Sequence, residues 1–323
     1  MPTLTHHKLD RRRRHFIGTS LATTALAISG SVAAKSAKVW LDYDQETLDK
    51  VYNQSNYAPN IKTVISRYGS NSELTRTRLG KPKRLSYGDA DIEAFDLYAA
   101  DQHNAPIHIF LHGGAWRAGD ANGYGFLAEP FVANGAHFLI PDFTNVLEHD
   151  GNLMPMTEQI LRSIAWAYQN AESFGGDKNR IYISGHSSGG HLAGVAVTTD
   201  WENEFNLPPD IIKGAVLISG MFDLKPVRLS SRSNYVAFTD EIEQRLSPQR
   251  HLDKLNTPVV LVYGDLETPE FIRQTKDFAA AAEKAGKPVQ LIEGPGYNHF
   301  EIAETMANPY GIAGLPALAQ MGL

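Results

Sequence analysis

The stretch Ile181-Tyr-Ile-Ser-Gly-His-Ser-Ser-Gly-Gly190 decides the fold of this chain. Residues 180–184 are typical of a buried strand, and the small residues at 191–197 are typical of a helix packed on a sheet. Between them, the residues around Ser187 read Gly-x-Ser-x-Gly, the pattern of a strand-to-helix turn that exposes a nucleophilic serine. We expect glycine at 185 and 189 because a Cβ there would clash where strand and helix pass closely. Ser187 is therefore the candidate nucleophile.

Apolar runs on both sides of this turn predict alternating strands and helices. Strands are predicted at 92–98, 107–111, 137–140, 212–220, 258–263 and 288–292, and helices at 123–135, 156–174 and 270–285. Buried strands that alternate with helices are typical of a parallel sheet covered on both faces. At 323 residues and 42% hydrophobic content, the chain can form a full core. We therefore predict an α/β fold with a doubly wound, mostly parallel sheet and helices on both faces.

Two segments depart from the alternation, although we assign all of residues 35–323 to a single domain. Residues 37–84 mix polar side chains with a helix-like piece at 44–52, and we interpret them as a wrap that borders the active site. Residues 221–255 contain short helical pieces rich in Asp, Pro, Ser and Arg, which we interpret as a small cap over the pocket. Aromatic residues in or near the cap either line an acyl or aryl pocket or pack the cap down. The candidates for substrate contact are Trp116, Trp201, Phe222 and Tyr235.

The N-terminus has a character of its own. Four arginines at 11–14 precede a mildly apolar stretch that is rich in Ala, Ser, Thr and Gly and extends to Ala34. This pattern resembles a twin-arginine signal peptide over residues 1–34. The alternatives are a basic nucleic-acid-binding arm or an uncleaved membrane anchor, but the stretch would span a bilayer poorly and the chain's net charge is −6. We expect a periplasmic or secreted protein with no nucleic-acid partner and no membrane insertion after cleavage.

Several chemistries lack the residues that they need. The absence of cysteine excludes disulfides, thiolate metal sites and a cysteine nucleophile. The sequence has no G-x-x-x-x-G-K-[ST], no H-E-x-x-H and no G-x-G-x-x-G after the first strand, and no two histidines have ligand spacing in a supporting context. We therefore expect neither a metal nor a cofactor.

A glycine loop follows the predicted strand at 107–111. It reads His112-Gly113-Gly114-Ala115-Trp116, and two glycines allow backbone N–H groups to turn inward. A serine hydrolase needs such donors to hold the oxyanion of its tetrahedral intermediate. We expect His112 to orient this loop. The Gly-Gly pair alone would also suit an ordinary turn, but the loop and the serine turn in this order indicate a hydrolase.

The serine requires a base, and the last predicted strand should deliver it. His299 is the only histidine beyond that strand. His251 lies in the cap, whereas His186 and His191 are too near Ser187 in sequence to meet it across the top of the sheet. His299 is therefore the candidate base.

The acid that orients this base should follow the strand at 258–263. Asp265 adjoins the strand end, and aspartate is the commoner acid. Glu267 lies three residues past the glycine that ends the strand, which is the usual position in this architecture. Glu270 follows a proline and suits the first turn of the next helix. We favour Glu267 and keep Asp265 as the alternative.

Four motifs together resemble the kynurenine formamidase (arylformamidase) type of α/β-hydrolase, within the HGGxW esterases. They are His112–Trp116, Gly185–Ala193, Glu267–Phe271 and Tyr297–Glu301, and the likeness extends from about Leu48 to the end. The resemblance implies an α/β-hydrolase fold with Ser187 as nucleophile, His299 as base and Glu267 as acid. It also implies an oxyanion hole formed by the N–H groups of Gly113, Gly114 and Ser188. The formamidases have aspartate where this chain has Glu267, which is longer by one methylene.

These features predict an exported serine hydrolase, a carboxylesterase or an arylformamidase-like enzyme. Ser187 would attack a small-molecule ester or an activated amide such as an aryl formamide, and water would release the acyl group. The alternatives are an arylformamidase proper and a binding protein without activity on the same fold.

Overall fold

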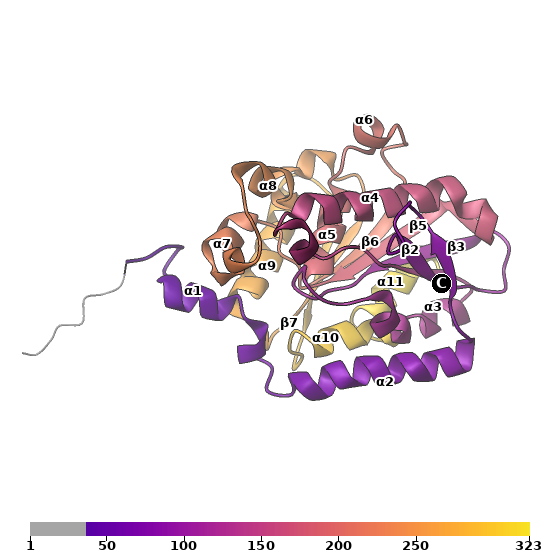
Figure 1. Ribbon diagram of the computed structural model, residues 1–323, viewed down its shortest axis with the longest axis horizontal. Helices are drawn as coiled ribbons and strands as arrows, with labels where there is room; N and C mark the ends of the chain where they lie inside the picture. The colour runs from indigo at the N-terminus through magenta and orange to yellow at the C-terminus, as the bar shows by residue number, and fades with distance from the viewer. Residues whose placement is uncertain (1–36) are drawn as a thin grey trace, which may run out of the picture. The chain divides into compact units, whose positions relative to one another are not determined.

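The computed structural model describes residues 37–323, which form one compact unit (Figure 1). The signal peptide predicted at 1–34 lies outside the described residues. A single sheet has the strand order β1-β2-β4-β3-β5-β6-β7-β8. Strands β3 to β8 run parallel, whereas β2 pairs antiparallel with both β1 and β4. The predicted α/β fold with a mostly parallel sheet is confirmed. The strands are β1 Lys83–Ser86, β2 Ala94–Tyr98, β3 Ala105–Leu111, β4 His137–Pro141, β5 Gly176–His186, β6 Ile212–Ile218, β7 Val259–Gly264 and β8 Val289–Gly294.

Helices cover both faces of the sheet, with α4 and α5 on one side and α2 and α10 on the other (Figure 1). Between β6 and β7, the segment 221–255 forms only short helices, including α7 and α8. No helix of residues 37–323 has the length and apolarity that a membrane crossing requires. The α-helices are α1 Gln45–Val51, α2 Ile61–Leu79, α3 Glu129–Ala133, α4 Leu153–Asn170, α5 Ser188–Val197, α6 Trp201–Phe205, α7 Leu224–Leu229, α8 Asp240–Arg245, α9 Pro269–Lys284, α10 Glu301–Glu304 and α11 Gly314–Met321.

The sheet separates two hydrophobic cores, because successive side chains of a strand point to opposite faces. In β3, Ile107 and Ile109 belong to the core that includes α4, α5 and α9. Phe110 belongs to the core on the opposite face, with α2, α3, α10 and α11. β6 and β7 divide their side chains in the same way. Burial on both faces explains why these strands are continuous apolar runs in the sequence.

The elements differ from the predicted ones where the apolar signal is weak. Helix α2 was not predicted, because its sequence is largely polar and contains Gly69. The helix predicted at 123–135 is instead a 3-10 helix, Ala121–Leu127, followed by the short α3. Gly123, Gly125 and Pro130 fall in this region, and these residue types disfavour a continuous α-helix. The segment 37–84 is therefore more than a wrap, since α2 packs against the second core.

Candidate active site

Ser187 lies in a strained turn between β5 and α5. Its φ is 59° and its ψ is −121°, a conformation that a residue with a Cβ rarely adopts. A Cβ on Gly185 would lie 2.2 Å from the Gly189 oxygen, and a Cβ on Gly189 would lie 2.0 Å from the Leu111 oxygen. The turn thus requires both glycines, and the strand and helix hold Ser187 at the carboxyl edge of the sheet.

We expect Gly189→Ala to destabilise the protein, because the new methyl group would collide with backbone that cannot move independently of β3. An overpacking cost of about 3 kcal/mol would lower the Tm by about 5 °C in a domain of this size. Gly69→Ala is the matched control, since nothing lies within 4 Å of its added Cβ in the exposed part of α2. That variant should gain about 0.5–1 kcal/mol. Calorimetry on both proteins checks the pair, and an unchanged Tm for Gly189→Ala would contradict the steric role.

The structure brings Ser187, His299 and Glu267 together at the carboxyl ends of the strands. The Ser187 Oγ lies 2.8 Å from His299 Nε2, and His299 Nδ1 lies 2.7 Å from Glu267 Oε2. All three residues are buried, with exposures of 7%, 3% and 3%. Because Nδ1 faces a carboxylate, it carries the proton, and Nε2 is then free to accept the hydroxyl proton of the serine.

Four donors fix the Glu267 carboxylate. Oε1 accepts hydrogen bonds from the Ser219 hydroxyl and the Gly264 N–H, and Oε2 accepts one from the Gln54 side chain as well as from His299. Both oxygens therefore accept hydrogen bonds, which fix the orientation of the carboxylate toward His299. No sequence motif marks Gln54, whereas Ser219 directly follows β6, at the same edge of the sheet as Ser187.

The two other carboxylates considered from the sequence lie apart from the histidine. Asp265 is exposed and accepts a hydrogen bond from the Gly296 N–H at 2.6 Å. Glu270 is buried, but it pairs with Arg273 at 2.8 Å and accepts a hydrogen bond from the Tyr52 hydroxyl. Among the described residues, Glu267 is the carboxylate that bonds His299.

The glycine loop after β3 lies directly against the serine. A Cβ added to Gly113 would be 3.2 Å from Ser187 Cβ, and Gly114 has a φ of 131° that favours glycine. The N–H groups of Gly114 and Ser188 donate to no acceptor within residues 37–323, so they are available to a ligand. The Tyr124 hydroxyl lies near Gly113. Burial raises the pKa of Tyr124, and the nearby Gly113 N–H partly offsets this rise. This arrangement suits an oxyanion hole.

The neighbouring histidines serve other purposes, and burial lowers the pKa of each, which keeps them neutral. His186 Nε2–H donates to the His299 carbonyl at 2.7 Å and so anchors the loop that carries His299. His191 bonds the Trp116 indole and the Leu246 carbonyl, and burial lowers its pKa to about 4. His112 donates from Nδ1 to the Gly113 oxygen at 3.0 Å, as expected for a residue that orients the loop.

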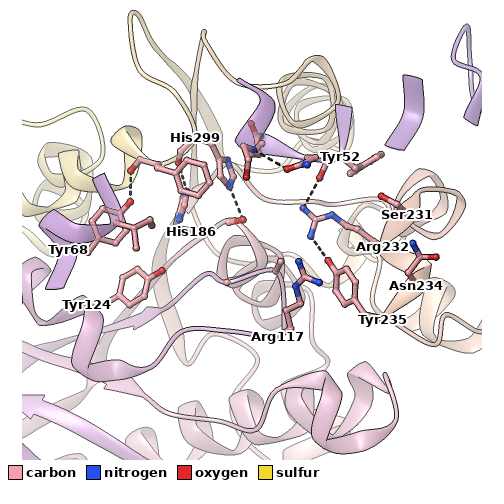
Figure 2. Close-up of a pocket in the computed structure, with 18 residues that line it drawn as sticks. Tyr52, Tyr68, Arg117, Tyr124, His186, Ser231, Arg232, Asn234, Tyr235 and His299 are labelled. Carbon is pink, nitrogen blue, oxygen red and sulfur yellow. Dashed lines mark hydrogen bonds between the residues drawn. The ribbon is translucent and has the colours of Figure 1, made fainter. Parts of the chain in front are cut away.

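A cavity of about 440 Å³ opens onto Ser187 and His299. Tyr68 and Tyr124 lie to one side of His299 in Figure 2. Ile65 and Phe300 also line the cavity. The other side is polar and is formed by the segment 231–235, Arg117 and the stretch 52–55. Polar residues at one end and aromatic rings at the other suit a small molecule with two chemically different halves.

Of the four aromatic candidates for substrate contact, only Tyr235 lines this cavity. Trp116 is 2% exposed and donates its indole N–H to His191 Nδ1. Trp201 is buried and donates to the Ala196 oxygen, and Phe222 is buried against Phe278. The expectation of direct contact by these three is corrected, because their rings belong to the hydrophobic core that includes α4, α5 and α9. Four further residues line the cavity although no sequence motif marks them: Arg117, Arg232, Tyr68 and Tyr124.

Comparison with known proteins supports the fold and the resemblance drawn from the motifs. Residues 95–281 match the BD-FAE family. Kynurenine formamidase of Danio rerio is 29% identical over 83% of this chain and 94% of its own length. Esterase LipC of Mycobacterium tuberculosis is 26% identical over 70% of this chain and 61% of its length. A Pyrobaculum calidifontis esterase structure superposes with a TM-score of 0.63 at 17% identity, over 86% of this chain and 97% of that one.

The matched region contains the glycine loop, Ser187 and Glu267, and it covers more than half of the chain. The mostly parallel sheet and the solved esterase structure agree with it on the fold. This chain belongs to the BD-FAE family of α/β-hydrolases.

Proposed function

We propose that the protein is an exported serine hydrolase that cleaves a carboxylic ester or an activated amide through an acyl-enzyme. The observation that carries the proposal is the continuous hydrogen-bonded chain from Ser187 Oγ through His299 to Glu267. A binding protein would not require a strained serine beside such hydrogen-bonded residues. The relatives of this chain are named formamidase and esterase, which also supports hydrolysis. The export part rests on the arginine-containing N-terminus.

The reaction follows from the positions of the protons. Ser187 Oγ attacks the substrate carbonyl carbon while its proton passes to His299 Nε2, and Glu267 stabilises the resulting imidazolium through Nδ1–H. The carbonyl oxygen becomes an anion, which the N–H groups of Gly113, Gly114 and Ser188 would hold. His299 then donates its proton to the departing alcohol or amine as the carbon–heteroatom bond breaks. Water, deprotonated by His299, releases the acyl group and restores Ser187.

A paired assay separates the two substrate classes. We expect the full-length protein to hydrolyse 4-nitrophenyl acetate, because Ser187, His299 and Glu267 form a continuous hydrogen-bonded chain. N-formylaniline, assayed beside it, tests the formamidase alternative that the Danio rerio relative's name favours. A higher kcat/KM for the formanilide would assign the protein as a formamidase. Turnover of neither substrate, together with no labelling by diisopropyl fluorophosphate, would contradict the proposed function.

A further inference from the structure

The cavity beside Ser187 carries positive charge in a chain that is acidic overall. The chain has a net charge of −6, yet the cavity lining contains two arginines, Arg117 and Arg232, and neither aspartate nor glutamate. The lining histidine His186 stays neutral because of its burial. Within the described residues, no carboxylate forms an ion pair with either arginine. A ligand that enters the cavity therefore meets two guanidinium groups that no carboxylate of the described residues pairs with.

Of the two arginines, Arg232 gives the stronger evidence, because it is buried, with an exposure of only 8%. It donates to the Tyr235 hydroxyl at 2.9 Å and to the Tyr52 carbonyl at 3.1 Å (Figure 2). A guanidinium has five N–H donors, and the buried Nε–H of Arg232 has no partner. The Trp116 ring, 5.6 Å from the guanidinium carbon, steadies the cation without accepting a conventional hydrogen bond. Arg232 lines the cavity, and its two terminal nitrogens each make one of these bonds, which leaves each with a second N–H for a ligand.

Two other arginines of the segment 221–255 form ion pairs with carboxylates, in contrast to Arg232. Arg228 pairs with Asp240 and Glu243, and Arg250 pairs with Glu243 at 2.8 Å. These cations are neutralised within the segment 221–255 and do not line the cavity. Burial of an unpaired cation is costly, so the absence of a carboxylate at Arg232 indicates that its counter-charge arrives with a ligand.

Arg117 reaches the same end of the cavity from a different part of the chain. It follows the glycine loop, and its guanidinium carbon lies 4.3 Å from the centre of the Tyr235 ring. Tyr235 therefore contacts Arg117 through its ring and Arg232 through its hydroxyl. Figure 2 shows both arginines beside Tyr235, across the site from Tyr68 and Tyr124.

We propose that the substrate is a carboxylate-bearing ester or amide, and that Arg232 and Arg117 bind this carboxylate while Ser187 attacks the scissile carbonyl. The planar guanidinium fork with free N–H donors matches the two oxygens of a carboxylate. The apolar remainder of the substrate would lie toward the tyrosines at the opposite end. This inference rests on the proposed hydrolase function, and its test separates the two.

Matched esters that differ only in charge test the inference. 4-Nitrophenyl hydrogen adipate has its carboxylate on the acyl side, and 4-acetoxybenzoate has it on the leaving group. The methyl ester of each is its neutral partner. In at least one pair, we expect the anionic ester to have a kcat/KM about tenfold or more above that of the neutral ester at low salt. The pair that shows the preference identifies the half of the substrate that bears the carboxylate.

Substitutions then assign the preference to the arginines. Arg232→Gln should reduce the anionic-to-neutral ratio of kcat/KM by about 10-fold to 100-fold, and Arg232→Lys by less, because it keeps the charge. Arg117→Gln should reduce the ratio by a smaller factor, because Arg117 is exposed and screened. Arg228→Gln, from the same segment but outside the cavity, should leave the ratio unchanged. If the Arg232 variants fail to fold, Arg117→Gln and the salt dependence of the ratio decide the matter.

The failure of the inference is distinct from the failure of the proposed function. Hydrolysis of both members of each pair at equal rates would overturn the inference and leave the hydrolase intact. Calorimetric binding of 4-nitrophenyl hydrogen adipate, but not its methyl ester, to the Ser187→Ala protein would support the carboxylate site without turnover. Such binding, with no hydrolysis by the unmodified protein, would support the site and contradict the proposed hydrolase.

Discussion

Ser187→Ala should reduce kcat for 4-nitrophenyl acetate by at least about 10⁴-fold, since a triad that loses its nucleophile retains only binding and oxyanion stabilisation. The residual rate would then reflect water attack in the pocket. Removal of one hydroxyl leaves the turn intact, because the Ser187 N–H, which bonds the Ile218 oxygen at 2.9 Å, and the two glycines remain. Loss of activity in a protein of unchanged Tm would therefore report on chemistry.

Labelling gives an independent readout of the same residue. Diisopropyl fluorophosphate should add one phosphoryl group to the unmodified protein, at Ser187, and none to Ser187→Ala, as measured by mass spectrometry of the intact and digested chains. Labelling at another serine, or full esterase activity in the alanine variant, would remove Ser187 from the mechanism.

The sequence was informative about the fold wherever both faces of an element are buried. β3, β5, β6 and β7 lie in the middle of the sheet, so their apolar runs are continuous and could be assigned as strands. The edge strand β1 is largely exposed and reads Lys-Arg-Leu-Ser, which carries no apolar signal. Helix α2 buries only one narrow side, with Val64 and Tyr68, and so it resembles a loop in sequence.

The site was predictable to the extent that local geometry restricts residue type. The turn at Ser187 excludes a Cβ at two neighbouring positions, and that restriction is visible as glycines. Trp201 and Phe222 carry no such mark, because an aromatic ring in a core and one in a pocket look alike in sequence. The sequence does not single out Arg232 for a related reason. Arg232 is unusual because it is buried without a carboxylate partner, and its partners are known only from the folded structure.

Glu267→Gln should reduce kcat by about 10³-fold to 10⁴-fold, although it changes a single atom. The Glu267 carboxylate accepts hydrogen bonds from four donors, which belong to Ser219, Gly264, Gln54 and His299. If the new NH₂ group faces His299, Nδ1 must accept its hydrogen bond, and the ring proton then lies on Nε2. A protonated Nε2 cannot accept the hydroxyl proton of Ser187. If the NH₂ group turns the other way, it opposes the Ser219 hydroxyl and the Gly264 N–H and leaves a buried donor unsatisfied.

Asp265→Asn is the matched control for this substitution, because it makes the same carboxylate-to-amide change two residues away. The Asp265 side chain is exposed and accepts from the Gly296 N–H, which an asparagine oxygen also accepts, so kcat should change by less than about threefold. Steady-state kinetics on both variants decide between the two acids considered from the sequence. A large loss in Asp265→Asn with a small one in Glu267→Gln would move the acid to Asp265 and require the loop 264–268 to rearrange during turnover, since Glu267 occupies His299 Nδ1 in the resting structure.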